Sequence, residues 1–135
     1  MKAIVLFLFL SFGLLGAFAQ DVAAPSTVPS TAVREAGAEK ALANVNTVAV
    51  YAKGLCCSSC AIGIRKYISK LPFVDRKKPK SGVGLDAKAQ LAIITLKPGA
   101  APDGPSIAKA IRKAGYEPVE LYQKKAGRVV RSFLK

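Results

Sequence analysis

All three cysteines of the chain lie within one heptapeptide, Gly54-Leu55-Cys56-Cys57-Ser58-Ser59-Cys60. The apolar, largely β-branched run before it, residues 45–52, predicts a strand. After it, apolar residues recur at steps of three and four and predict a helix over residues 59–71, which Pro72 ends. The cysteines are therefore expected at a turn from strand to helix.

Cys57 and Cys60 are three positions apart, so their sulfurs can converge on one point at the start of the predicted helix. We expect Ser58 or Ser59 to cap the first free N–H groups. The positive end of the helix dipole favours the thiolate, which binds metals and attacks disulfides. Three clustered cysteines are too few to be the framework of a disulfide-stapled domain, so the pair is interpreted as a site.

The first residues are typical of a secretory signal peptide (1–19). Lys2 supplies a positive charge, residues 3–16 are apolar, and Ala17-Phe18-Ala19 fits the small-x-small pattern for cleavage after Ala19. An uncleaved membrane anchor is the alternative. We therefore expect a periplasmic or secreted protein. Residues 20–44 are rich in Ala, Pro, Ser and Thr and predict a flexible linker, with at most a transient helix.

The chain is strongly basic, with a formal net charge of +13. Such a protein is drawn to anionic surfaces, and export makes nucleic acid a poor candidate partner. The basic C-terminal tail, residues 124–135, holds five basic side chains among four large apolar ones. It is interpreted as a solvated tail or, alternatively, as an amphipathic segment that contacts an acidic protein or an anionic membrane surface.

The order of predicted elements between residues 45 and 123 is β-α-β-β-α-β. This order predicts an α+β, ferredoxin-like plait, in which a four-stranded antiparallel sheet carries two helices on one face. Pro118 lacks a backbone donor, so the last strand is expected at a sheet edge. The apolar positions predict a single core: Val48, Val50, Ile64, Ile68, Leu71, Val83, Leu91, Ile93, Ile107, Ile111, Val119 and Leu121.

A strand, then Gly54-Leu55-Cys56-Cys57-Ser58-Ser59-Cys60, a helix, and a closing Ala114-Gly115-Tyr116 together resemble the heavy-metal-associated domain. This family includes small copper chaperones, domains of metal-transporting ATPases and exported mercury-binding proteins. The resemblance covers residues 45–122 and places Cys57 and Cys60 on the two metal-binding positions. Two features depart from the family motif: Leu55 replaces the usual Met, a volume-conserving change, and Cys56 adds a candidate third ligand.

The resemblance implies that the protein binds a soft heavy-metal ion, Cu(I) or Hg(II), and passes it on by thiolate ligand exchange. The chain has no histidine, and one loop offers three sulfurs at most, which does not suit four-coordinate structural zinc. Calcium and magnesium prefer oxygen ligands. The expected acceptor is a metal-transporting ATPase or another thiol-bearing partner, and no catalysis or organic cofactor is expected. Leu55 and Tyr116 are expected to pack beside the metal loop, and Arg65 and Lys66 to offset the charge of a copper dithiolate or simply to be exposed.

The rival interpretation is a thiol–disulfide oxidoreductase that uses the same cysteine pair. Such enzymes usually hold Gly-Pro or Pro-His between the cysteines and a Trp just before them. Here the intervening pair is Ser58-Ser59, and the chain has no Trp. A purely structural disulfide, or an adaptor without metal, also stays open, as do the identity of the metal, the partner and the oligomeric state.

Overall fold

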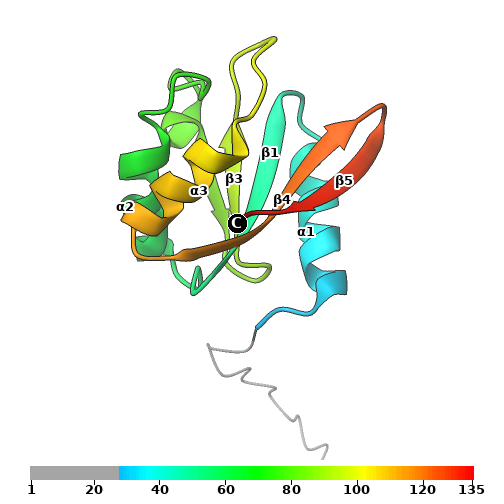
Figure 1. The fold of residues 1–135 in the computed structure, drawn as a ribbon, viewed down its shortest axis with the longest axis vertical. Helices are drawn as coiled ribbons and strands as arrows, with labels where there is room; N and C mark the ends of the chain where they lie inside the picture. Colours follow the sequence, from blue (N-terminus) through cyan, green and yellow to red (C-terminus); the bar gives the residue numbers. More distant parts are fainter. Residues whose placement is uncertain (1–27) are drawn as a thin grey trace, which may run out of the picture.

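The computed structural model describes residues 28–135, so the predicted signal peptide and its cleavage after Ala19 lie outside the described residues. The described chain has an α+β architecture with three α-helices and one five-stranded antiparallel sheet (Figure 1). Within residues 28–135, no helix is long and apolar enough to span a bilayer. The elements are α1 (Thr31–Leu42), β1 (Thr47–Lys53), α2 (Ser58–Ile68), β2 (Val83–Asp86), β3 (Leu91–Thr95), α3 (Gly104–Lys113), β4 (Glu117–Lys125) and β5 (Arg128–Phe133), with a short 3-10 segment, Pro79–Gly82, before β2.

The sheet has the strand order β2-β3-β1-β4-β5, and every neighbouring pair is antiparallel. The predicted β-α-β-β-α-β order is present from β1 to β4. The prediction of four strands is wrong because β5 adds a fifth at the edge of β4. Its residues, Arg128–Phe133, belong to the segment that was expected to be a basic tail.

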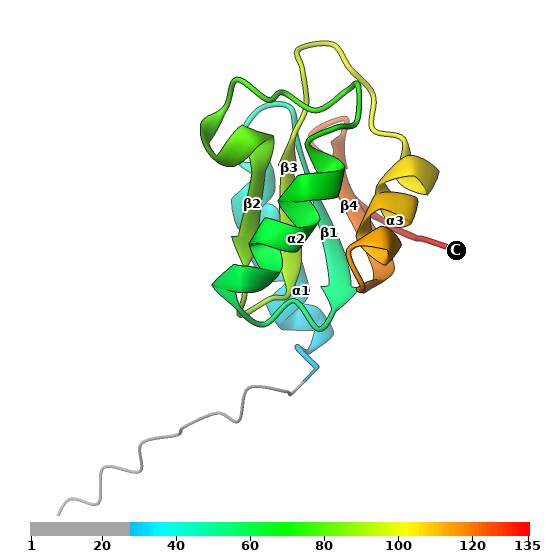
Figure 2. The ribbon, with the colours of Figure 1, turned by 90° about the vertical axis from the view of Figure 1, so that its left-hand side faces the viewer.

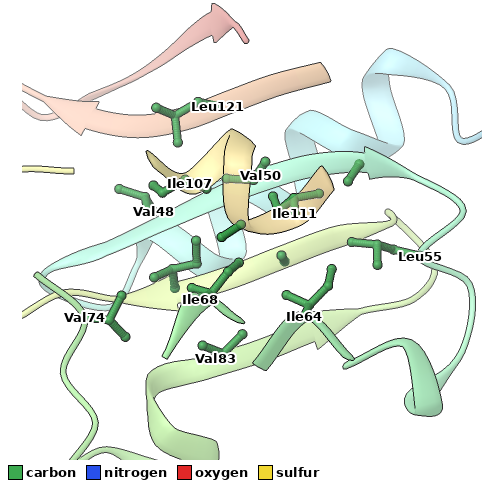
Figure 3. Close-up of a cluster of buried hydrophobic side chains, with 14 of the residues drawn as sticks. Val48, Val50, Leu55, Ile64, Ile68, Val74, Val83, Ile107, Ile111 and Leu121 are labelled. Carbon is green, nitrogen blue, oxygen red and sulfur yellow. The ribbon is translucent and has the colours of Figure 1, made fainter. Parts of the chain in front are cut away.

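Helices α2 and α3 cover one face of the sheet (Figure 2), and the main core lies between these layers (Figure 3). Ile64 and Ile68 of α2 and Ile107 and Ile111 of α3 are each at most 1% exposed. The spacing of four residues within each pair is the helical periodicity that the sequence displays. This packing fixes the start of α2, where the cysteine loop lies.

Helix α1 covers the opposite face, so the prediction of a flexible linker up to residue 44 is wrong for residues 31–42 (Figure 1). Ala38, Ala41 and Leu42 are buried against the sheet. Small side chains, together with Gly37, let this helix approach the strands closely. A helix that packs through alanine and glycine shows almost no apolar periodicity in its sequence, which is why the pattern did not reveal it.

A buried ion pair joins α1 to the sheet. Arg34 Nε lies 3.1 Å from Glu120 Oε2, and the Tyr122 hydroxyl donates to the same carboxylate oxygen at 2.5 Å. The guanidinium of Arg34 also lies 4.5 Å from the centre of the Tyr51 ring. Burial and the bond to Glu120 raise the pKa of Tyr122. The carboxylate is thus held by partners from α1 and β4.

The single predicted core is divided by the sheet into two. Leu91 and Ile93 of β3 pack on the α1 side, whereas Ala92, Ile94 and Leu96 face α2 and α3. Because both faces of β3 are covered, neither set of alternating residues is polar, and the sequence could not show which set joins Val48 and Val50. Val119 likewise packs on the α1 side.

The expectation that the last predicted strand lies at a sheet edge because of Pro118 is also wrong. Strand β4 lies between β1 and β5, and Pro118 pairs with Ala52 just beyond a register shift that leaves Val119 of β4 without a partner in β1. The β5 pairing covers Glu120 to Lys125 and leaves Pro118 outside it. A tight turn at Ala126 and Gly127, both with positive φ, connects the two strands. Proline is therefore tolerated at a position where no partner needs its N–H.

Candidate metal centre

The cysteine loop connects the end of β1 to the start of α2 (Figure 2). Gly54 has a φ of +89°, which favours glycine, and its N–H donates to Gln90 Oε1 at 3.2 Å. The Cys56 N–H then donates to the Gly54 carbonyl at 2.9 Å. Leu55 is fully buried in the main core (Figure 3). Its side chain thus anchors the loop to the main core.

Cys57 is itself the residue that precedes the first turn of α2, with extended backbone at φ −144° and ψ 160°. Neither Ser58 nor Ser59 caps the helix, because both lie inside it and no side chain makes a capping bond there. The expectation of a serine cap is therefore wrong. The position that a serine oxygen would normally occupy is taken by the thiol of Cys57.

The structure brings the three sulfurs together. Cys57 Sγ and Cys60 Sγ are 2.7 Å apart, and all three Sγ atoms lie within 4.8 Å of one another. Cys56 and Cys57 are exposed, while Cys60 is buried and its Sγ lies 3.7 Å from the Gly54 carbonyl oxygen. The cluster is therefore open to solvent on one side and packed against the protein on the other.

The local hydrogen bonds favour a thiolate at Cys57. Donation from the Cys60 thiol and from the Ser59 hydroxyl, whose Oγ lies 3.2 Å from Cys57 Sγ, lowers the pKa of Cys57 to about 7. Desolvation and the neighbouring sulfurs raise the pKa of Cys56. Near neutral pH, Cys57 is thus the cysteine primed to bind a metal ion or attack a disulfide.

Tyr116 approaches the loop from the turn between α3 and β4. A Cβ placed on Gly54 would lie 3.5 Å from Tyr116 Cδ1, so the ring packs against the loop backbone. The proximity of its hydroxyl to the Cys60 thiol, together with burial, raises the pKa of Tyr116 to about 12. Leu55, which lies within the loop, and Tyr116, which approaches it from outside, therefore both fix the position of the loop.

Arg65 and Lys66 take no part in this cluster. Arg65 Nε donates to the Val83 carbonyl of β2 at 3.4 Å, and the Lys66 ammonium lies 5.8 Å from the centre of the Tyr67 ring. The idea that they offset the charge of a copper dithiolate therefore finds no support in their contacts. These contacts fit better with the alternative interpretation, in which Arg65 and Lys66 belong to a helix face that has no role at the cysteine cluster.

Ser59 and Gln90 contact the cysteine loop but were not singled out from the sequence for these roles. Gln90 comes from the turn between β2 and β3, far along the chain from Gly54. No local pattern reveals such a contact, because only the pairing of β1 with β3 brings the two residues together. Ser59 lies within the motif, and its spacing from Cys57 was its only signal.

The donor set consists of sulfur alone. Among residues 28–135, the group of potential metal ligands at this point comprises Cys56, Cys57 and Cys60, without a carboxylate. The chain contains no histidine. Thiolates select soft ions, and three sulfurs at most leave a tetrahedral zinc ion short of one ligand. The cluster therefore suits a soft ion of low coordination number.

No family model and no curated protein matches the chain. One solved structure is similar to part of it, described as "Crosstalk between Cu(I) and Zn(II) homeostasis". The two share 24% sequence identity and a TM-score of 0.41, over 62% of this chain and 97% of that chain. A TM-score at this level does not establish a common fold.

Proposed function

We propose that the protein binds a soft heavy-metal ion, Cu(I) or Hg(II), through Cys57 and Cys60 and passes it to a partner by thiolate ligand exchange. The observation that carries the proposal is the convergence of these two sulfurs, 2.7 Å apart, at the start of α2. Cu(I) and Hg(II) are soft ions that favour thiolates and accept few ligands. The role is that of a carrier or scavenger and not of an enzyme.

The exposure of the site supports transfer. Cys57 is open to solvent, whereas Cys60 is buried beside Gly54 and Tyr116. An incoming thiolate can therefore attack the ion from the Cys57 side. A mixed-ligand intermediate would form before the Cys60 thiolate dissociates from the ion. The proposed acceptor is a metal-transporting ATPase or another thiol-bearing protein, and the proposed location is periplasmic or extracellular.

The fold supports the same assignment at a coarser level. The order β-α-β-β-α-β with the strand order β2-β3-β1-β4 favours classing residues 47–125 as a ferredoxin-like plait. In this interpretation, the heavy-metal-associated domain is extended by α1 on the second face and by β5 at one edge. Strand β5 pairs with β4, and α1 packs in the second core cluster, which contains no residue of the cysteine loop.

Anaerobic titration of the reduced protein with Cu(I), in competition with a chelator of known affinity, tests the proposal. We expect one ion to bind per chain, and binding to be lost in Cys57→Ser and in Cys60→Ser. Ser58→Ala is the matched control, because Ser58 lies between the cysteines and makes no bond to either of them among the described contacts. A wild-type protein that binds neither Cu(I) nor Hg(II) would refute the proposal.

Thiol–disulfide exchange is the second candidate function, and the pKa of about 7 at Cys57 favours it. Insulin reduction by the metal-free protein with dithiothreitol distinguishes the two functions. Turnover above the background of dithiothreitol alone, abolished by Cys57→Ser, would favour the oxidoreductase. We expect background rates only.

A further inference from the structure

We propose that Cys56 completes a three-thiolate site, and that the cargo of this protein includes soft ions that take three sulfur ligands. This inference rests on the proposed function, because it assigns a third ligand to the same metal site. Its basis is that Cys56 Sγ lies with the other two sulfurs in a cluster no wider than 4.8 Å. A site with only the Cys57–Cys60 pair would leave the third position to a partner or to solvent.

Both neighbours of Cys56 are fixed, and this limits where its sulfur can go. Leu55 is fully buried in the main core, and Cys57 holds the position before the first turn of α2. The bond from the Cys56 N–H to the Gly54 carbonyl, 2.9 Å long, closes the backbone into a tight turn between them. Cys56 is exposed, so no other side chain has to move for its sulfur to reach an ion.

The composition of the cluster favours three-coordination over four. No carboxylate joins the three sulfurs within the described residues, and the chain has no histidine. A third thiol attached to the same loop acts at a high effective concentration and outcompetes free thiols for the open position of the ion. Three sulfurs without a fourth donor thus match an ion whose preferred coordination number is three.

Trivalent arsenic is the probe that separates three ligands from two. Arsenous acid, As(OH)3, reacts with three thiols to give As(SR)3 and three waters. Three As–O and three S–H bonds break, three As–S bonds form, and each thiol proton leaves with a hydroxide. Arsenic stays trivalent, so no oxidant or reductant is needed. Hg(II) is the matched probe for two sulfurs, because it is satisfied by linear coordination.

The experiment compares the reduced wild-type protein, Cys56→Ser and the loop control Ser58→Ala under anaerobic conditions, with sodium arsenite and with mercuric chloride. Native mass spectrometry gives the ions per chain and the protons displaced, and competition with dithiothreitol gives relative affinities. We expect the wild type to bind one arsenic with the loss of three protons. Cys56→Ser should weaken arsenite binding at least about 30-fold and change Hg(II) binding less than about threefold.

Three outcomes would overturn the inference. Equal arsenite affinity in the wild type and Cys56→Ser would show that Cys56 is not a ligand. An arsenic ion shared by two chains would show that the third sulfur comes from another molecule. An equal loss of arsenite and Hg(II) in Cys56→Ser would place Cys56 in the primary pair. In each case the proposed function survives if Hg(II) or Cu(I) still binds to the wild type, whereas failure of both ions refutes the proposed function itself.

Discussion

Cys57 is the exposed member of the proposed metal-binding pair, and its acidity can be tested directly. Hydrogen bonds from the Cys60 thiol and the Ser59 hydroxyl lower its pKa from 9.0 to about 7. Only the thiolate reacts with iodoacetamide, so its alkylation rate should rise with pH and reach half its maximum near pH 7. Peptide mapping after timed alkylation of the reduced protein measures this rate at each cysteine.

The same measurement carries its own controls. Ser59→Ala removes one stabilising donor and should move the midpoint for Cys57 upwards, whereas Ser58→Ala should leave it in place. Cys56, whose pKa is raised, should react more slowly than Cys57 at neutral pH. A midpoint for Cys57 close to 9 in the wild type would contradict the assigned hydrogen bonds.

Glu120 is the residue whose loss should destabilise the protein most clearly without touching the site. Its side chain is 4% exposed and pairs with Arg34, which is 11% exposed. Glu120→Gln leaves a buried guanidinium without its counter-charge, and we expect the free energy of unfolding to fall by about 3 kcal/mol. Urea denaturation measures the change.

Glu117→Gln is the matched control for Glu120→Gln. Glu117 makes the same kind of ion pair with Lys53, but the two side chains are 65% and 51% exposed. Exposed pairs contribute little, so this substitution should change the free energy of unfolding far less than Glu120→Gln does. Similar losses for both variants would mean that the ion pair between α1 and the sheet does not hold the helix in place.

At the scale of elements, α1 depends on close approach, and two glycines test this. A Cβ on Gly37 of α1 would lie 2.8 Å from Ala89 Cβ, whereas one on Gly63 of α2 would have no atom within 4 Å. Alanine stabilises a helix interior by about 1 kcal/mol over glycine, so Gly63→Ala should stabilise by that amount. Gly37→Ala should instead destabilise by about 1 kcal/mol, because the contact with Ala89 forces α1 off the sheet.

Thermal and urea unfolding of both glycine variants measure this difference. Circular dichroism should show the same helix content in the two proteins, which separates a packing effect from a loss of helix. Stabilisation by Gly37→Ala would mean that α1 does not pack as closely as the structure shows.

These elements also show what the sequence could and could not reveal. The strands and helices from β1 to β4 were predicted because Ile64, Ile68, Ile107 and Ile111 recur with helical spacing between strand-like runs. Helix α1 was not predicted because alanine and glycine form much of its buried face. Strand β5 was not predicted because arginines interrupt the alternation of apolar and polar residues along it. The convergence of the cysteine sulfurs was predicted from their spacing, whereas the contact of Gln90 with the loop was not, since tertiary pairing alone brings it there.

At the scale of the whole molecule, the cysteine loop is held by both halves of the fold. Binding of an ion at the loop should therefore stabilise the whole domain against unfolding. Leu55 enters the main core after β1, and Tyr116 reaches the loop from the turn after α3. An ion that binds only the native site stabilises it by about 2.7 kcal/mol when its free concentration is 100 times its dissociation constant. Buffered Cu(I) should therefore raise the midpoint of a single cooperative unfolding transition.

The comparison of variants decides whether that stabilisation comes from the site. Cys57→Ser and Cys60→Ser should unfold at one temperature with or without the ion, because the pair that binds it is broken. Tyr116→Phe keeps the ring against Gly54 and should retain most of the shift. If Cu(I) instead raised the midpoint equally in the cysteine variants, the ion would be acting elsewhere on the chain. If it shifted only a local transition around α2, the loop would be uncoupled from the sheet, contrary to the packing of Leu55 in the main core.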